Sequence, residues 1–406
     1  MIKVNVRIKN LDDYGRGIAY INNKITFIKN ALTDELIEYK DLIEKKKYNE
    51  AEINRIFSQN ENRTQPICPY YYECGGCNLQ HLNFLYENEF KVEKVKNILK
   101  KFAGFEINDI KIISQNCYNY RNKITLTVKN GKLGLLKAKT NDLVEIKSCN
   151  LINKKLNNLI EVLETIIKNE PELEKICLKI GNKTDEVMIS LSGKVNDKTP
   201  FLNICDSLII NKKVVTKSYI TSYIKDKKFH IRSDSFFQVN DEIVEKLYQE
   251  VIDNIKKIKS KNVLDLYCGV GTIGISVAEY VENVIGVEIT KEAIIDANEN
   301  KKINNIKNIE FKEGKVENIL PSINEEIDTV IVDPPRNGLD SITRKTLIKN
   351  KYKNIIYISC DPITLARDLK ELKQLYELKS IKLFNMFPRT YHVECVSVLH
   401  RKSLEK

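Results

Sequence analysis

Short runs of alternating polar and apolar residues dominate the first part of the chain. Runs such as Val4–Ile8, Ile25–Ile28 and Ala51–Ile56 are separated by residues typical of turns, including glycines and an Asn-Asn pair. This pattern predicts several short β-strands within residues 2–57. Because so many short strands in so few residues are typical of a closed structure, we expect a small β-barrel over residues 1–57.

The second stretch, residues 58–230, mixes both periodicities. Apolar positions on one helical face predict a helix over 85–102. A strand over 120–128 followed by Asn130-Gly131 predicts a β-hairpin, and a helix near 153–167 precedes a strand pair near 176–192. We therefore expect an α+β central domain.

The third stretch, residues 231–406, contains continuous apolar runs typical of buried strands. These strands alternate with helical segments, as in a doubly wound α/β fold with a Rossmann-like parallel sheet. The runs cover residues 263–266, 284–288, 328–332 and 355–358, and two further strands are expected over 381–384 and 395–399.

Composition narrows the class of protein. The chain has 406 residues, of which 42% are apolar, so it can bury a sizeable core. A formal net charge of +11 favours a polyanionic partner without identifying one. We see no signal peptide and no apolar run long enough to span a membrane, so we expect a cytoplasmic protein with no membrane partner. Ten cysteines in such a chain indicate metal binding or catalysis rather than disulfides.

Three of these cysteines form a cluster. Cys68, Cys74 and Cys77 fall within ten residues, and two adjacent glycines let the backbone turn tightly before the last of them. Because histidines are sparse in this half of the chain, a four-ligand site needs a distant thiol, for which Cys149 is the candidate. Four thiolates suit either zinc or an iron–sulfur cluster, and the chemistry alone leaves both open.

Candidate reactive residues follow the strands of the third stretch. Cys360 comes directly after the run at 355–358 and precedes Asp361-Pro362, which must leave the strand. Ligands bind at the carboxyl ends of strands in open α/β sheets, so we hypothesise that Cys360 is a nucleophile, although a lone cysteine is commonly a small core residue. A glycine-rich turn after Asp265, with Glu288 ending the next strand, is typical of nucleotide cofactor sites, including nicotinamide sites.

Several motifs together resemble one family. Tyr14-Gly-Arg-Gly-Ile-Ala resembles a TRAM domain, an OB-like RNA-binding module, and the spacing C-x₅-C-G-G-C with the later Cys149 resembles the [4Fe–4S] ligand set of bacterial RNA uracil-C5 methyltransferases. Asp265-Leu-Tyr-Cys-Gly-Val-Gly resembles motif I of class I S-adenosylmethionine methyltransferases, and Asp333-Pro-Pro-Arg resembles motif IV of nucleic-acid methyltransferases. Ser-Phe-Phe-Gln-Val-Asn at 235–240 and His-Val-Glu at 392–394 also match family blocks.

The resemblance implies a reaction and its residues. It implies S-adenosylmethionine-dependent methylation of uracil C5 in 23S ribosomal RNA, by an enzyme that we expect to act as a monomer. Cys360 would add to C6 of the base, and Glu394 would remove the C5 proton. The cofactor would contact Gln238, Tyr267, Glu288 and Asp333. A structural [4Fe–4S] cluster would be held by Cys68, Cys74, Cys77 and Cys149.

Other interpretations stay open. The same reaction on tRNA is one, and the barrel and cysteine cluster favour the ribosomal-RNA branch because the tRNA-specific relatives usually lack both. An iron–sulfur redox or radical enzyme and a non-catalytic RNA-binding assembly factor are two more. Thr272 and Lys315 depart from residues that relatives commonly carry near the adenine, which leaves those contacts undefined.

Overall fold

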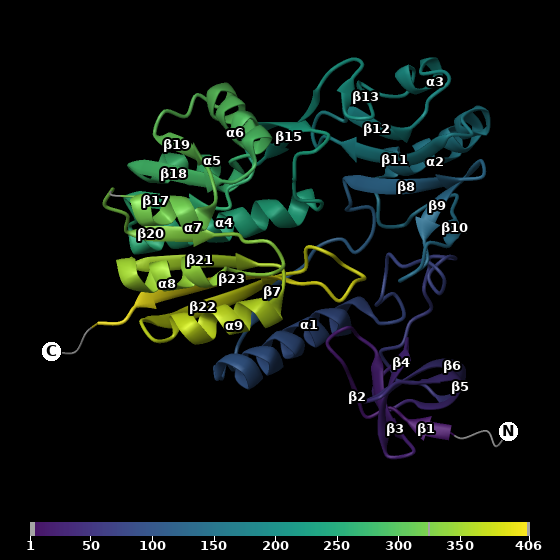
Figure 1. Ribbon diagram of the computed structural model, residues 1–406. Helices are drawn as coiled ribbons and strands as arrows, with labels where there is room; N and C mark the ends of the chain where they lie inside the picture. Colours follow the sequence, from purple (N-terminus) through teal and green to yellow (C-terminus); the bar gives the residue numbers. More distant parts are fainter. Residues whose placement is uncertain (1–4, 324, 404–406) are drawn as a thin grey trace. The chain divides into compact units, whose positions relative to one another are not determined.

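The computed structural model describes residues 5–323 and 325–403 (Figure 1). The chain divides into two compact units. The first contains the residues up to Lys94 together with Leu135–Val144 and Phe387–Tyr391, and the second contains Val95–Gly134, Glu145–Met386 and the residues from His392 onward. No helix in the described ranges combines the length and hydropathy needed to cross a membrane.

The first unit contains a six-stranded sheet that curls round on itself. Strand β1 pairs with β5 at one end of the sheet order, and β2 pairs with β3 at the other end. Since only two residues separate β1 from β2, one bent segment belongs to both edges. This curled sheet is consistent with the expected barrel, although Val4 of the first predicted strand lies outside the described residues. The strands, in the order β1-β5-β6-β4-β3-β2, are β1 Asn5–Arg7, β2 Asn10–Leu11, β3 Gly17–Ile21, β4 Lys24–Lys29, β5 Leu36–Glu44 and β6 Asn49–Ser58.

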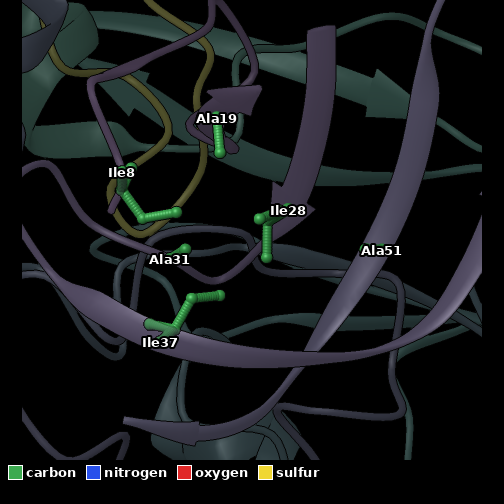
Figure 2. Packing of buried hydrophobic residues seen from close by; sticks show 6 residues of the cluster. All are labelled: Ile8, Ala19, Ile28, Ala31, Ile37 and Ala51. Carbon is green, nitrogen blue, oxygen red and sulfur yellow. The ribbon is translucent and has the colours of Figure 1, made fainter. Parts of the chain in front are cut away.

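The inside of this sheet is packed with a mixture of large and very small residues. Figure 2 shows the cluster formed by Ile8, Ala19, Ile28, Ala31, Ile37 and Ala51, all of which are buried. A Cβ atom on Gly17 would lie 2.8 Å from the Cβ of Ala31 and 2.9 Å from Ile8. The small side chains therefore let strands on facing sides of the curled sheet approach one another closely.

A buried ion pair in the first unit holds a segment from near the end of the chain. Glu87 and Lys91 lie one turn apart on α1 (Phe84–Ile98), 2.8 Å apart, and neither side chain is exposed. The Glu87 carboxylate also accepts the backbone N–H of Arg389 at 3.0 Å, and Lys91 Nζ donates to the carbonyl of Phe387 at 3.3 Å. Burial lowers the pKa of Lys91, while the Glu87 charge acts in the opposite direction.

Removing one partner of this pair is expected to destabilise the protein strongly. Glu87→Gln removes the negative charge that pairs with the buried Lys91 ammonium, so the free energy of unfolding should fall by about 3–5 kcal/mol. Glu89→Gln, on an exposed position of the same helix, is the matched control and should change stability by less than about 0.5 kcal/mol. Urea denaturation measures both variants, and equal effects would contradict this account of the pair.

The second unit carries most of the central elements predicted from the sequence. Helix α1 continues into a π-helical turn at Leu99–Ala103, and the predicted hairpin is formed by β8 and β9 around Asn130 and Gly131, whose φ angles are 53° and 68°. Positive φ at both positions is the requirement of a type I′ turn. The seven strands, in the order β10-β9-β8-β11-β12-β13-β14, are β8 Lys123–Lys129, β9 Lys132–Leu136, β10 Leu143–Glu145, β11 Leu173–Ile180, β12 Val187–Gly193, β13 Ser207–Ile210 and β14 Lys213–Val214. Helices α2 (Lys154–Ile166) and α3 (Thr199–Leu202) and the hairpin β15 (Tyr219–Ile224) with β16 (Lys227–Arg232) complete this region.

The third stretch folds as the predicted doubly wound sheet. Five strands, β19 to β21 in the sheet order, are parallel, and β23 inserts antiparallel between β21 and β22. A short strand from the central region, β7 (Lys111–Ile113), extends the far edge, which the sequence pattern did not predict. The order is β19-β18-β17-β20-β21-β23-β22-β7, with β17 Asn262–Leu266, β18 Asn283–Glu288, β19 Ile309–Glu313, β20 Thr329–Val332, β21 Asn354–Ser359, β22 Tyr376–Phe384 and β23 Glu394–Arg401.

Helices flank this sheet in two groups (Figure 1). One group is α4 (Asp241–Ile258), α5 (Thr272–Val277) and α6 (Lys291–Ile303), and the other is α7 (Val316–Ile319), α8 (Ser341–Asn350) and α9 (Pro362–Leu372). The chain runs outward from β17 to β18 and β19, then returns to place β20 on the other side of β17. This reversal makes a topological switch point between β17 and β20, where open α/β sheets bind ligands.

Candidate active site

Three of the predicted site residues, together with Asp265 of the glycine-turn motif, lie at one edge of the eight-stranded sheet. Glu288 is the last residue of β18, Asp333 follows β20, and Cys360 follows β21. Asp265 is the penultimate residue of β17, between them. Because these strands are parallel, their carboxyl ends meet at the switch point, as the sequence predicted.

Strand register brings the fifth residue, Glu394, to the same edge. In the antiparallel pair β21–β23, Ile358 lies opposite Val396 and Ser359 opposite Cys395. The next position in this register places Cys360 opposite Glu394. The two residues predicted to carry the chemistry therefore meet, although 34 positions separate them in the sequence.

Cys360 lies between a strand and a helix. Asp361 caps α9, because its carboxylate accepts the backbone N–H groups of Ile363 at 2.8 Å and Thr364 at 3.1 Å, and Pro362 begins the helix. The Cys360 thiol is partly buried, and burial together with the charges of Glu394 and Asp333 raises its pKa to about 12. The Arg336 guanidinium opposes this effect and favours the thiolate.

Three carboxyl groups at this end of the sheet hold their protons unusually tightly. Burial raises the pKa of Glu394 to about 8, with a further contribution from the charge of Asp333. Burial raises the pKa of Asp333 to about 7 and that of Asp265 to about 8. Asp265 Oδ2 accepts the N–H of Gly274 at 2.9 Å, while its Oδ1 is buried without a hydrogen-bond partner among the described residues. Such a group of perturbed acids in one site is typical of acid–base chemistry.

These raised pKa values predict that stability falls as pH rises. The three carboxyls bind protons more tightly in the folded than in the unfolded chain, so their contribution is complete below roughly pH 4 and is lost as pH rises through roughly 7 to 8. We expect the melting temperature of the wild type to decrease between pH 5 and pH 8. The melting temperature of Glu394→Gln should decrease less steeply over the same range. Thermal unfolding at several pH values measures both slopes. If melting temperature falls with the same slope against pH in the wild type and in Glu394→Gln, Glu394 is not a buried carboxyl that ionises in this range.

Two of the predicted cofactor residues, Tyr267 and Glu288, lie at the turn after β17. Tyr267 has a φ angle of 64° and Gly271 one of 81°, and a Cβ atom on Gly271 would lie 2.6 Å from Phe311, so only glycine fits there. Glu288 Oε2 accepts the N–H of Gly269 at 3.2 Å, and a Cβ atom on Gly269 would meet nothing within 4 Å. A ligand can therefore approach this backbone closely, beside a carboxylate suited to ribose hydroxyls.

Gln238 lies in a loop that is fixed by residues whose role the sequence did not reveal. The side-chain amide of Asn122 donates to the carbonyl of Gln238 at 3.0 Å. The buried Lys179 ammonium donates to three carbonyls just upstream, those of Arg232 and Ser233 at 2.8 Å and of Ser235 at 3.1 Å. Burial lowers the pKa of Lys179 to about 8. Only their positions within the predicted strand at 120–128 and within the predicted strand pair at 176–192 could have drawn attention to them.

Tyr248 joins the helix after Gln238 to the glycine turn. Its hydroxyl lies 2.7 Å from the Thr272 hydroxyl, and burial together with the charges of Asp333 and Asp265 raises its pKa. Thr272, where relatives commonly carry an amide, therefore forms a hydroxyl pair with α4.

The four predicted cysteine ligands are divided between the two compact units. Within residues 5–323 and 325–403, no group of three or more histidine, cysteine, aspartate or glutamate side chains is arranged to hold a metal ion. Cys68, Cys74 and Cys77 belong to the first unit and Cys149 to the second. Two sulfurs accept local hydrogen bonds, Cys74 from the N–H of Gly76 at 3.4 Å and Cys77 from the amide of Gln80 at 3.3 Å.

Comparisons with known proteins agree with the arrangement at the sheet edge. Residues 86–402 match the model of the family described as tRNA (uracil-5-)-methyltransferase. An uncharacterized RNA methyltransferase of Staphylococcus aureus strain MSSA476 is 33% identical over 97% of both chains, and one of Clostridium tetani is 32% identical over 97% of this chain and 95% of its own. The crystal structure of Pyrococcus abyssi tRNA (uracil-54, C5)-methyltransferase with S-adenosyl-L-homocysteine is 29% identical, with a TM-score of 0.84, over 98% of this chain and 100% of that one.

This structural match also bears on the choice between ribosomal RNA and tRNA, which rests, from the sequence, on the barrel and the cysteine cluster. The likeness to a tRNA enzyme covers nearly the whole chain, including the N-terminal unit. The presence of that unit therefore does not separate a ribosomal-RNA enzyme from a tRNA enzyme. With a family match over most of its length and relatives above 30% identity over nearly all of it, this chain belongs to the RNA uracil-C5 methyltransferase family.

Proposed function

We propose that this protein methylates C5 of a uridine in RNA, with S-adenosylmethionine as methyl donor. The observation that carries the proposal is the β21–β23 register, in which Ser359 lies opposite Cys395, so that the next residues, Cys360 and Glu394, come together near Asp333. A thiol, a carboxylate base and a second carboxyl group at the cofactor edge of this fold match the needs of uracil methylation, because C5 of uracil is a poor nucleophile until C6 is attacked.

In the proposed reaction, the Cys360 thiolate adds to C6 of the uracil and makes C5 nucleophilic. When bound, S-adenosylmethionine supplies an electrophilic methyl group to C5, with Gln238, Tyr267, Glu288 and Asp333 as its contacts. Glu394 then takes the proton from C5, and the C6–S bond breaks, which returns the Cys360 thiolate and releases 5-methyluridine. Asp333 also orients the polar edge of the base. A base that reaches this edge must be unstacked, so a loop or flipped nucleotide is expected.

The RNA proposed from the sequence is 23S ribosomal RNA, on the strength of the barrel and the cysteine spacing. tRNA is the second candidate, favoured by the likeness to the Pyrococcus abyssi tRNA enzyme over nearly the whole chain. Tritiated S-adenosylmethionine, offered with unmodified 23S ribosomal RNA or with total tRNA, separates them through analysis of the product nucleosides. Label in 5-methyluridine from ribosomal RNA supports the first proposal, and label from tRNA alone replaces it with the second. No label from either RNA contradicts the proposed activity.

We also propose that the protein acts as a monomer built from a barrel at 1–57, a central RNA-binding domain at 58–230 and the methyltransferase domain at 231–406. Exposed aromatic rings beside cations support RNA contact by the barrel, such as Tyr20 under Lys9 at 5.0 Å and Phe57 under Arg55 at 5.2 Å. RNA protection assays that compare the RNA affinity of the wild type with that of Tyr20→Ala and Phe57→Ala test RNA contact by the barrel. Unchanged affinity in these variants would contradict it.

An iron–sulfur cluster on Cys68, Cys74, Cys77 and Cys149 is proposed from the sequence resemblance alone. The hydrogen bonds donated to the sulfurs of Cys74 and Cys77 are of the kind that cluster thiolates accept. No step of the reaction above involves a cluster. Iron and sulfide analysis of anaerobically purified protein, with Cys74→Ser as comparison, decides the proposal, and iron-free protein would contradict it.

A further inference from the structure

Side chains of helix α9 donate hydrogen bonds to the loop that carries Arg336. This Arg336 loop, residues 334–340, links Asp333 to α8. Thr364 Oγ1 donates to the carbonyl of Arg336 at 3.1 Å. One turn later on the same helix, Arg367 Nη2 donates to the carbonyls of Asn337 at 2.9 Å and Leu339 at 3.0 Å. Side chains from one helix therefore hold three carbonyls of the loop.

Asp368, also on α9, forms a further hydrogen bond to the same loop. Its carboxylate, which is fully buried, accepts the N–H of Leu339 at 2.8 Å and the hydroxyl of Tyr357 on β21 at 2.7 Å. Gly338 passes so close that a Cβ atom there would lie 2.6 Å from Asp368 Oδ2, and its φ angle of 69° favours glycine in any case. The loop is thus pinned between α9 and β21 rather than left free at the surface.

The same helix begins two residues after Cys360. Its cap, Asp361, and the strand before it, β21, fix Cys360, so the thiol and the backbone of Arg336 are both attached to α9. The charged groups that act on Cys360 are Glu394 from β23, Asp333 and Arg336 from the loop after β20, and Asp361 from the cap of α9. Arg336 is the cation of this set, and its position depends on the loop.

We propose that Thr364, Arg367 and Asp368 are positioning residues that hold the Arg336 guanidinium beside Cys360 and so favour formation of the nucleophilic thiolate. The inference rests on the proposed function for its meaning in catalysis. Its physical content, that α9 sets the ionisation of Cys360 through Arg336, is measurable without RNA or S-adenosylmethionine. Failure of the inference and failure of the proposed activity are therefore distinguishable.

The test is the pH dependence of alkylation at Cys360 by iodoacetamide, followed on the Cys360 peptide by mass spectrometry. Arg336→Gln removes the cation and should raise the apparent pKa by about one unit, which slows alkylation about tenfold below that pKa. Arg367→Gln removes two of the loop contacts and should slow it by about threefold. Arg367 is half exposed, so this change is expected to leave the fold intact. Lys370→Gln removes the same charge from an exposed position of α9 that shows no hydrogen bond to the loop within the described residues, and should change nothing.

A double-mutant cycle identifies the route of the effect. If Arg367 acts through Arg336, the Arg336→Gln, Arg367→Gln protein alkylates no more slowly than Arg336→Gln alone. Additive effects of the two changes, or equal effects of Arg367→Gln and Lys370→Gln, would overturn the inference. Thr364→Val, which removes one hydroxyl and nearly preserves shape, is the second variant should Arg367→Gln lower the melting temperature. It should also slow alkylation relative to the wild type, and an unchanged rate would count against the inference.

Discussion

Cys360→Ala is expected to abolish methyl transfer while the protein still binds S-adenosylmethionine. The thiol is the group that would activate the base, so its loss should reduce turnover by at least about 10⁴-fold. The proposed cofactor contacts lie mainly around β17 and β18, whereas Cys360 follows β21, so the cofactor dissociation constant should stay within about twofold of the wild type. Single-turnover methylation and calorimetric titration measure the two quantities.

The control is a second thiol that shares the physical state of Cys360 but lies elsewhere. Cys205 is also partly buried, and burial raises its pKa to about 11, but it lies between α3 and β13 in the central region. Cys205→Ala should therefore turn over normally. Methyl transfer that survives in Cys360→Ala would remove the covalent mechanism altogether.

Glu394→Gln is expected to stop the reaction after the methyl group has arrived. Without a carboxylate opposite Cys360, the C5 proton has no base to receive it, and the C6–S bond cannot break by elimination. The covalent protein–RNA complex should accumulate to a large fraction of the enzyme and survive denaturing electrophoresis. Glu377→Gln, on an exposed position of β22, is the matched control and should leave no such complex.

The pH dependence of turnover follows from the same residue. Glu394 must be ionised to accept a proton, and its raised pKa of about 8 means that the ionised fraction grows as pH rises towards 8. The Cys360 thiolate must form as well, and its pKa is raised to about 12, so turnover in the wild type should increase steeply with pH below 8 and continue to increase, less steeply, above it. A rate that is flat between pH 6 and pH 8, or Glu394→Gln that turns over without a complex, would assign the proton to another group.

The strands of the cofactor half were predictable because both of their faces are buried. A strand in such a sheet is a continuous apolar run, and the run at 355–358 corresponds to β21 within a residue. Their carboxyl ends then placed Asp333, Cys360 and Glu288 at one edge without further information. The position of Glu394 close to Cys360 was harder to predict from the strand pattern. It depends on the register of β23 on β21, and these two strands are separated in the sequence by the whole of α9 and β22.

Contacts between polar side chains and backbone carbonyls had no signature in the sequence. Thr364 and Arg367 occupy positions on α9 that any exposed helical residue can take, and only the fold shows that they hold the Arg336 loop. The cysteine cluster shows the opposite limit. Its spacing is conspicuous, but no group of three or more metal-ligating side chains is found among the described residues. Contacts between residues far apart in the sequence are set by packing between segments, which local sequence patterns do not encode.

The most direct test of the account is the identity of the atom to which the RNA becomes attached. RNA substituted with 5-fluorouridine traps the reaction, because no proton remains at C5 for Glu394 to remove. After incubation with S-adenosylmethionine and digestion, mass spectrometry of the peptides should find a methylated fluorouridine nucleotide on Cys360. Attachment to a different cysteine, or methylated product from unsubstituted RNA with no trapped adduct on Cys360, would contradict the proposed mechanism.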